Sequence, residues 1–261
     1  MQARSADGTP IAVSRTGDGP ALVMVDPAGA FHGLRPMAGA VSALAQRFTV
    51  HTYDRRGRGD SGDAPDPAPG DAPEREVEDL AAVVELAGGE AYVYGFSSGC
   101  AVALRAAAAG LPIPRLALLE PPFVVDEPAD TAFVDELRGL IERGERGAAV
   151  EFFNRGIGVP DEFVAQLREH PAWPGLEAMA HTFLYDVAVT ASMTSDLLAA
   201  VRQPALVLNS DGSDDYLRGA ARDVAARIPA GEHRELPGDW HGVDDAALAE
   251  LLAGWFSAGR G

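Results

Sequence analysis

Short apolar runs alternate with amphipathic stretches along most of the chain, and this alternation predicts strands followed by helices. Runs of strand length occur at residues 11–15, 21–25, 48–53, 91–94, 115–119, 205–209 and 233–236. Several of these runs are apolar at successive positions, which is typical of a parallel sheet covered on both faces. Helical spacing of apolar residues predicts helices at residues 37–46, 74–86, 100–107, 217–228 and 248–256.

The alternation stops between residues 123 and 202, where the sequence predicts several helices interrupted by glycine and proline. An insertion of this kind fits a helical cap over the carboxyl edge of the sheet. We therefore predict a core formed by residues 1–122 and 203–261 and a cap formed by residues 123–202. The large apolar side chains of the cap are expected mainly to pack it, with three or four lining an apolar pocket. These side chains are Phe133, Phe152, Phe153, Trp173, Met179, Phe183, Tyr185 and Met193.

The composition limits the classes of function that the chain can serve. Its 261 residues, 47% of them hydrophobic, suffice for one large α/β core with an insertion. The formal net charge of −18 argues against nucleic acid or an anionic membrane as a partner. No apolar run approaches the roughly 18 residues of a membrane span, and the first residues lack a secretory signal, so a cytoplasmic location is expected. Cys100 is the one cysteine and is expected to be a small buried residue.

The most informative motif is Gly95-Phe96-Ser97-Ser98-Gly99, because it lies between a predicted strand and a predicted helix. That context is typical of a nucleophile elbow, a turn so sharp that its serine is held in a strained backbone conformation. Glycine on either side relieves the crowding, and the serine hydroxyl is left exposed at the start of the helix. Ser97 is therefore the predicted nucleophile.

A serine hydroxyl needs a neighbouring base, and His241 is the best candidate among the histidines. It follows a predicted short strand and precedes the last helix, so its loop is expected at the same sheet edge as the elbow. His32, after an early strand, is the alternative base. The remaining histidines are expected to be structural or exposed: His51, His170, His181 and His233.

With these motifs the chain resembles the α/β-hydrolases along nearly its whole length. The resemblance rests on the elbow, on the turn at residues 53–62, on Glu120-Pro121-Pro122 at the exit into the cap, and on the late His241. It implies an α/β-hydrolase fold, a mostly parallel sheet flanked by helices with an inserted helical cap. It also implies the order nucleophile, acid, histidine, with Ser97 first and His241 last. We interpret the turn at residues 54–62 as structural and not as a phosphate cradle.

The acid is the member of this set that the sequence leaves open. The superfamily most often supplies an aspartate after the strand that matches residues 205–209, and there our alignment places Ser213. Some relatives, the haloalkane dehalogenases among them, take the acid from the end of the preceding core strand, where this chain has Glu120. A carboxylate buried at a strand end is costly unless a partner compensates it, which favours a functional Glu120 over a structural one. We predict Glu120, with Asp214 and then Asp211 as alternatives.

The oxyanion hole is expected from the backbone N–H of Ser98 and an N–H of the loop after the early strand. The superfamily usually begins that loop with His-Gly, whereas this chain has Asp26-Pro27-Ala28. Pro27 has no N–H, so Ala28 is the predicted second donor. Asp26 is expected to bond across the loop, because a carboxylate aimed at a developing oxyanion would repel it.

Three functions fit these residues. The first is a cofactor-free serine hydrolase that cleaves a small or mid-sized apolar ester, thioester or lactone through an acyl-enzyme on Ser97. The second is a lyase, cyclase or carbon–carbon bond-cleaving enzyme of natural-product metabolism with His241 as acid and base, which the altered Asp26-Pro27 loop motivates. The third is a small-molecule binding protein without turnover. No zinc-type spacing, P-loop or dinucleotide fingerprint occurs, so no metal or cofactor is expected.

Overall fold

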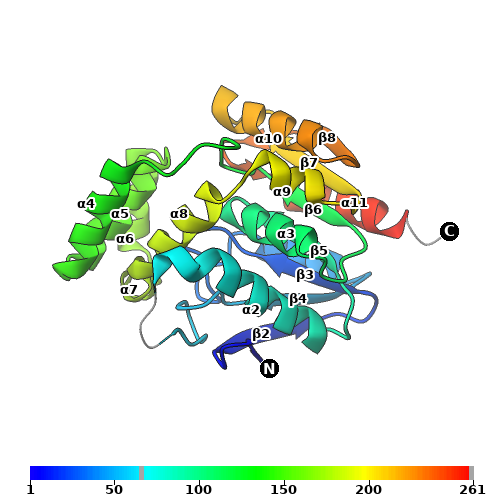
Figure 1. The fold of residues 1–261 in the computed structure, drawn as a ribbon, viewed down its shortest axis with the longest axis horizontal. Helices are drawn as coiled ribbons and strands as arrows, with labels where there is room; N and C mark the ends of the chain where they lie inside the picture. The colour runs from blue at the N-terminus through cyan, green and yellow to red at the C-terminus, as the bar shows by residue number, and fades with distance from the viewer. Residues whose placement is uncertain (65–67, 259–261) are drawn as a thin grey trace.

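A large sheet between two layers of helices dominates the computed structural model, which describes residues 1–64 and 68–258 (Figure 1). Its eight strands lie in the spatial order β1 (Gln2–Arg4), β2 (Pro10–Thr16), β4 (Thr49–Tyr53), β3 (Ala21–Val25), β5 (Tyr92–Phe96), β6 (Leu116–Leu119), β7 (Ala205–Ser210) and β8 (Gly231–Leu236). The pairs β1–β2 and β2–β4 are antiparallel, and all other neighbours are parallel. The predicted mostly parallel sheet is confirmed.

Helices cover both faces of this sheet (Figure 1). On one face lie α2 (Ala72–Leu86), α3 (Ser98–Ala108), α9 (Ser195–Ala200) and α10 (Asp215–Arg227), and on the other α1 (Ala38–Leu44) and α11 (Asp245–Ser257). Successive residues of β3 therefore enter different cores: Val23 and Val25 one, Leu22 and Met24 the other. This explains why the central strands are apolar at every position.

Between β6 and β7 the chain is helical, with α4 (Thr131–Glu142), α5 (Arg146–Gly156), α6 (Asp161–Glu169), α7 (Trp173–Ala178), the 3₁₀ turn η2 (Ala180–Thr182), α8 (Phe183–Ala191) and α9. The helices α4 to α7 lie to one side of the sandwich (Figure 1) and share a hydrophobic core in which Phe153 stacks on Phe183 at 4.2 Å. The helix α8 contributes to both cores, because its Phe183 and Leu184 lie in this one and its Val189 lies in the core on the sheet, where Leu198 of α9 also packs. The exact division into core and cap stays a prediction.

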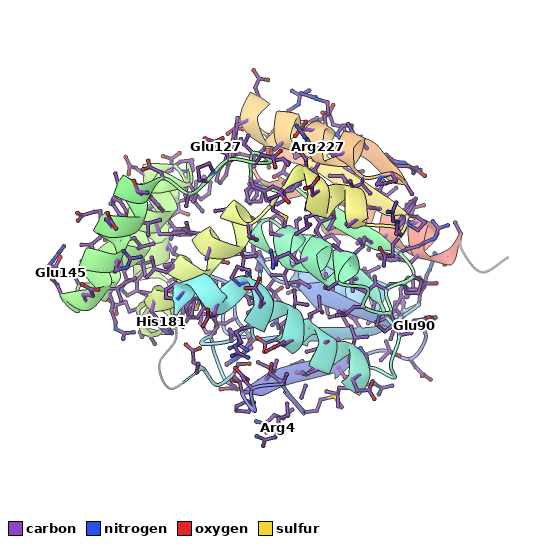
Figure 2. The ribbon with its side chains drawn as sticks, viewed as in Figure 1. Arg4, Glu90, Glu127, Glu145, His181 and Arg227 are labelled. Atoms are coloured by element: carbon purple, nitrogen blue, oxygen red, sulfur yellow. The ribbon has the colours of Figure 1, made fainter. Side chains whose placement is uncertain are left out.

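Three elements were not expected from the sequence: β1, the 3₁₀ turn η1 (Pro69–Asp71), and the two-stranded ribbon of β9 (Gly238–Asp239) and β10 (Gly242–Val243). Charged side chains such as Arg4, Glu90, Glu145 and Arg227 lie on the outside of the molecule (Figure 2). Among the described helices, none has the length and apolarity that crossing a bilayer requires.

Candidate active site

The turn between β5 and α3 has the geometry expected of a nucleophile elbow. Ser97 has φ 52° and ψ −124°, a strained conformation for a residue with a side chain. A Cβ at position 95 would lie 2.7 Å from the carbonyl oxygen of Gly99, and a Cβ at position 99 would lie 2.3 Å from that of Val25. Glycine is therefore sterically required at both positions. A Cβ at position 95 would clash within the turn, and a Cβ at position 99 would clash with β3.

The register of β5 and β6 places Ser97 and Glu120 side by side. Phe96 pairs with Leu119 in the parallel ladder, so the next residue of each strand lies at the same carboxyl edge. The Ser97 N–H donates to the carbonyl of Leu119 at 2.9 Å, and the Glu120 N–H donates to that of Leu208 in β7 at 2.8 Å. The sheet itself thus sets the separation of the predicted nucleophile and the predicted acid.

Glu120 is fully buried, at 0% exposure, and both of its carboxylate oxygens are occupied. Its Oε2 lies 2.6 Å from Nδ1 of His241. Its Oε1 accepts from the Ser210 N–H at 2.8 Å and from the Ser213 hydroxyl at 2.6 Å. These contacts compensate the burial of the carboxylate. They also hold His241 so that Nε2 is the ring nitrogen left to face a substrate.

His241 lies at the turn of the ribbon between β9 and β10, where its φ of 53° is in the left-handed region. Its backbone N–H donates to the Ser213 hydroxyl at 3.0 Å. Its ring lies 4.9 Å from that of Phe96, the residue directly before Ser97. The imidazole is therefore beside the elbow. Within residues 1–64 and 68–258 the Ser97 hydroxyl forms no hydrogen bond, so the proton transfer from Ser97 to His241 stays a prediction.

The two alternative acids are engaged elsewhere. Asp214 caps α10, because its Oδ1 accepts from the Leu217 N–H at 2.9 Å, and its Oδ2 lies 3.4 Å from Nε1 of Trp240. Asp211 accepts from the Gly238 N–H at 3.0 Å. Both stabilise the loops around His241, and the residue in contact with the imidazole is Glu120.

The alternative base, His32, belongs to another cluster. Its Nδ1 lies 2.7 Å from Oδ2 of Asp54, and ligand atoms of His32, Asp54 and Asp60 all lie within 4.8 Å of one another. The Asp54 carboxylate also accepts from the backbone N–H groups of His32 and Asp60 and from the guanidinium of Arg35. The carboxylate is thus satisfied by protein donors, one of them positively charged, which disfavours a cation at this place.

The loop after β3 carries the predicted oxyanion donor, Ala28. Asp26 is buried, and its Oδ2 accepts from Nε of Arg35 at 2.7 Å. Burial raises the pKa of Asp26, while Arg35 acts in the opposite direction. As expected, Asp26 bonds across its own loop. In the described part of the chain neither Ala28 nor Ser98 donates its backbone N–H to another residue.

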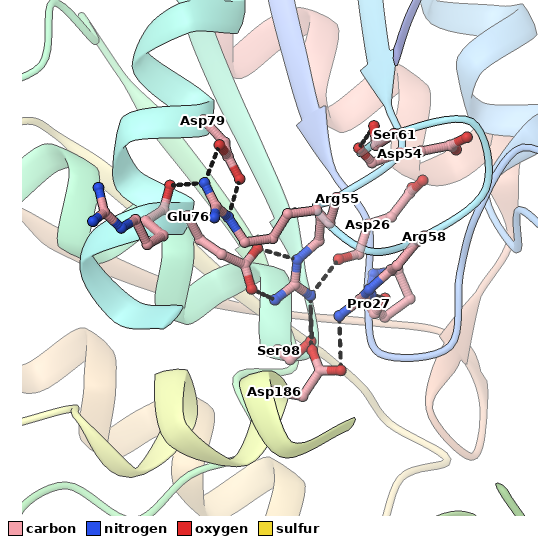
Figure 3. Close-up of polar contacts among 12 residues, drawn as sticks. Asp26, Pro27, Asp54, Arg55, Arg58, Ser61, Glu76, Asp79, Ser98 and Asp186 are labelled. Atoms are coloured by element: carbon pink, nitrogen blue, oxygen red, sulfur yellow. Dashed lines mark hydrogen bonds and ion pairs between the residues drawn. The ribbon is translucent and has the colours of Figure 1, made fainter. Parts of the chain in front are cut away.

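Beneath this loop lies a buried network of charges that the sequence did not predict (Figure 3). Arg55 forms a bidentate pair with Glu76 of α2, with two contacts of 2.5 Å, and also reaches Asp186 of α8 at 2.8 Å. The second Asp186 oxygen accepts from Arg58 at 2.8 Å, and the first accepts from the Ser98 hydroxyl. Burial raises the pKa of Asp186, but Arg58, Arg55 and Ser98 together lower it overall.

The arginines of this network come from the turn at residues 54–62, which we interpreted as structural. Its buried guanidinium groups tie it to α2 and α8. Arg55 and Arg58 have at most 1% exposure. The sequence feature that could have indicated a buried charge network is the presence of three arginines within four residues shortly after a buried strand. Their partners in α2 and α8 are far away in the sequence, so the pairing itself could not be predicted.

The large apolar side chains of residues 123–202 mostly pack, as expected. Phe153, Met179 and Phe183 are buried in the core of the helical segment, whereas Tyr185 and Met193 join the core on the sheet. The corner between α5 and α6 approaches the histidine loop. A Cβ at position 158 would lie 3.8 Å from Cζ2 of Trp240.

Comparisons with known proteins agree with this architecture. The family model described as "Alpha/beta hydrolase family" matches residues 13–253. An alpha/beta hydrolase from Sphaerobacter thermophilus has 43% identity and a TM-score of 0.88, over 98% of this chain and 100% of that chain. The esterase RhEst1 from Rhodococcus sp. shares the fold at 22% identity and a TM-score of 0.72, over 99% and 98% of the two chains. An enol-lactonase from Burkholderia xenovorans also shares the fold, at 18% identity and a TM-score of 0.69, over 99% of this chain and 98% of that chain. No curated protein matches the chain.

Proposed function

The chain belongs to the alpha/beta hydrolase family, and from this premise we propose that it is a cofactor-free serine hydrolase. Its substrate is a small or mid-sized apolar ester, thioester or lactone, cleaved through an acyl-enzyme on Ser97. The observation that carries the proposal is the 2.6 Å contact between Nδ1 of His241 and Oε2 of the buried Glu120, at the edge where Ser97 lies.

In this proposal Ser97 Oγ attacks the carbonyl carbon while His241 Nε2 takes the hydroxyl proton. Glu120 keeps the proton of the imidazole on Nδ1 and stabilises the imidazolium. The backbone N–H groups of Ala28 and Ser98 donate to the oxyanion of the tetrahedral intermediate. The intermediate collapses to the acyl-enzyme, and the leaving alcohol, thiol or lactone hydroxyl takes the proton from His241. Water, deprotonated by His241, then attacks the acyl group and releases the acid and free Ser97.

The substrate class is proposed from the surroundings of the elbow. Phe96 and Trp240 flank the imidazole at 4.9 Å and 5.4 Å, so the approach to His241 is aromatic on two sides. The corner at Gly158 approaches Trp240, which brings the helical segment next to the histidine loop. The structural relatives named as an esterase and an enol-lactonase agree with an acyl substrate, although they support the fold alone.

The altered loop gives the lyase alternative little support. The lyase was considered because of Asp26, and the Asp26 carboxylate accepts a hydrogen bond from Arg35. The hydrolase proposal is therefore preferred over the lyase, and the contact of buried Glu120 with His241 beside Ser97 favours it over a binding protein.

A panel of p-nitrophenyl esters from acetate to octanoate, with simple lactones and thioesters, tests this proposal. We expect turnover of at least one class and a burst of p-nitrophenol equal to the enzyme concentration where deacylation is slow. Ser97→Ala should abolish the burst. Turnover that survives in Ser97→Ala, or a wild type inert over the whole panel, would contradict the proposal.

A further inference from the structure

The buried Arg58 holds the peptide that carries the proposed oxyanion donor. Its Nη1 donates to the carbonyl oxygen of Pro27 at 2.9 Å, and its Nη2 donates to Asp186 at 2.8 Å (Figure 3). The Pro27 carbonyl and the Ala28 N–H belong to one trans peptide, since no cis bond occurs among the described residues. In a trans peptide the C=O and the N–H point in opposite directions. Fixing the Pro27 oxygen therefore fixes the direction of the Ala28 N–H.

Charge adds to this geometric effect. A hydrogen bond from a guanidinium to a carbonyl polarises the peptide, and the N–H at its other end becomes a stronger donor. Arg58 is about 1% exposed, so water does not weaken the contact. The same loop is held a second time, because Arg55 Nη1 lies 3.3 Å from the carbonyl oxygen of Asp26.

Asp186 links this peptide to the other proposed donor. Its Oδ2 binds Arg58, and its Oδ1 accepts from the hydroxyl of Ser98 at 2.8 Å. Ser98 is the first residue of α3, and its own N–H is the second oxyanion donor. One carboxylate thus connects the two donor positions through Arg58 on one side and the Ser98 side chain on the other. A buried ion pair seldom stabilises a fold more than apolar packing of equal volume would, so stability alone does not account for this arrangement.

We propose that Arg58 and Asp186 are positioning residues that set the direction and separation of the Ala28 and Ser98 N–H groups in the oxyanion hole. The inference rests on the proposed function, because it concerns the transition state of acyl transfer. It extends the site into the turn after β4 and into α8, two elements that do not carry the proposed nucleophile, base or acid.

The test compares Arg58→Lys with the matched control Arg56→Lys. Arg56 is buried in the same turn and pairs with Asp79 through two contacts of 2.7 Å. Its other hydrogen bonds within the described residues go to Asp7, Ser5 and the carbonyl of Arg75, and none goes to the loop after β3 or to Ser98. The probes are the best ester of the panel and its thionoester, in which sulfur replaces the carbonyl oxygen. An intact oxyanion hole favours oxygen, so the ratio of the two kcat/KM values reports the alignment of its donors.

For Arg58→Lys we expect kcat for the ester to fall roughly 10- to 100-fold, short of the ~10²–10³-fold for complete loss of a donor. KM should change less than about twofold, and the oxygen-to-sulfur ratio should fall in parallel with kcat. Arg56→Lys should keep the wild-type ratio even where its Tm is lower. An unchanged ratio in a folded Arg58→Lys overturns the inference.

Ser98→Ala provides a second test, because it keeps the backbone N–H and removes the hydroxyl that donates to Asp186 and accepts from Arg55. If Arg58→Lys does not fold, the decision passes to this variant: a lowered ratio supports the inference and a wild-type ratio overturns it. Failure of the proposed function looks different, since the wild type itself would then leave both probes intact.

Discussion

His241 Nδ1 lies 2.6 Å from Oε2 of Glu120, although 121 positions separate the two residues in the sequence. Glu120→Gln keeps the size of the side chain but no longer favours the tautomer with the proton on Nδ1. We expect kcat to fall by about 10⁴-fold, as is typical when the acid of such a triad is neutralised. Steady-state kinetics on the best substrate of the panel measure this loss.

Asp214→Asn is the control for this variant, because Asp214 caps α10 and does not contact the imidazole. It should retain wild-type turnover within a few fold. The opposite pattern, an active Glu120→Gln and an inactive Asp214→Asn, would transfer the role of the acid to Asp214.

Ser213 connects the predicted acid and base by a second path, since its hydroxyl donates to Glu120 and accepts from the backbone of His241. Ser213→Ala leaves a buried carboxylate oxygen with one donor fewer. We expect the free energy of unfolding to fall by about 1–3 kcal/mol and kcat to fall more moderately than in Glu120→Gln. Urea unfolding and kinetics on the same preparation check both effects. A kcat loss as large as that of Glu120→Gln would contradict a supporting role.

The stability of the buried charge network should depend on pH with a defined sign. The folded-state pKa of Asp186 is lower than its ordinary value, so its ionised form stabilises the fold. That contribution is fully present above about pH 4 and is lost as the pH falls through the folded-state pKa. Asp186→Asn should therefore lower the free energy of unfolding by about 3–5 kcal/mol at neutral pH, and by less under acid conditions.

Urea unfolding at a series of pH values from 7 down to 3 measures this difference. Asp223→Asn, which removes an exposed partner of Arg227, should have little effect at any of these pH values. A loss in Asp186→Asn that stays constant down to pH 3 would contradict the assignment of the stabilisation to the Asp186 carboxylate.

The steric requirement for glycine at position 99 of the elbow can be tested against the same substitution at a helical glycine. Gly99→Ala places a Cβ 2.3 Å from the Val25 carbonyl oxygen, so we expect a strongly destabilised and inactive protein. Gly254→Ala lies in α11 with no atom within 4 Å of the new Cβ, and should stabilise the fold by about 0.5–1 kcal/mol. Thermal unfolding of both variants gives the comparison. An active, stable Gly99→Ala would contradict the steric argument.

The sequence was informative where local residues determine the geometry. The glycines around Ser97 and the apolar runs of the central strands predicted the elbow and the sheet, because sharp turns and doubly covered strands each demand particular residue types. Glu120 was predicted from the resemblance to relatives that take the acid from this strand end, together with the cost of burying an uncompensated carboxylate there. The resemblance to a known superfamily supplied the order of the site residues.

What the sequence missed depends on contacts between distant segments. Arg55 and Arg58 looked like ordinary turn residues, because their partners Glu76 and Asp186 lie on α2 and α8. From the sequence, Ser213 was noted only because it stands where relatives usually have an aspartate. In the structure its hydroxyl donates to Glu120. Neither pairing has a local pattern that could predict it. The arginine pairs depend on how α2 and α8 pack, whereas the Ser213–Glu120 contact joins the loop after β7 to the end of the neighbouring strand β6.

The central claim is that Ser97 is a nucleophile activated by His241, and intact-mass analysis after treatment with a fluorophosphonate probe tests it most directly. The account predicts one covalent adduct on the wild type, and none on Ser97→Ala or His241→Ala when both variants are folded. A folded wild type that stays unlabelled, or an adduct that persists in Ser97→Ala, would contradict it.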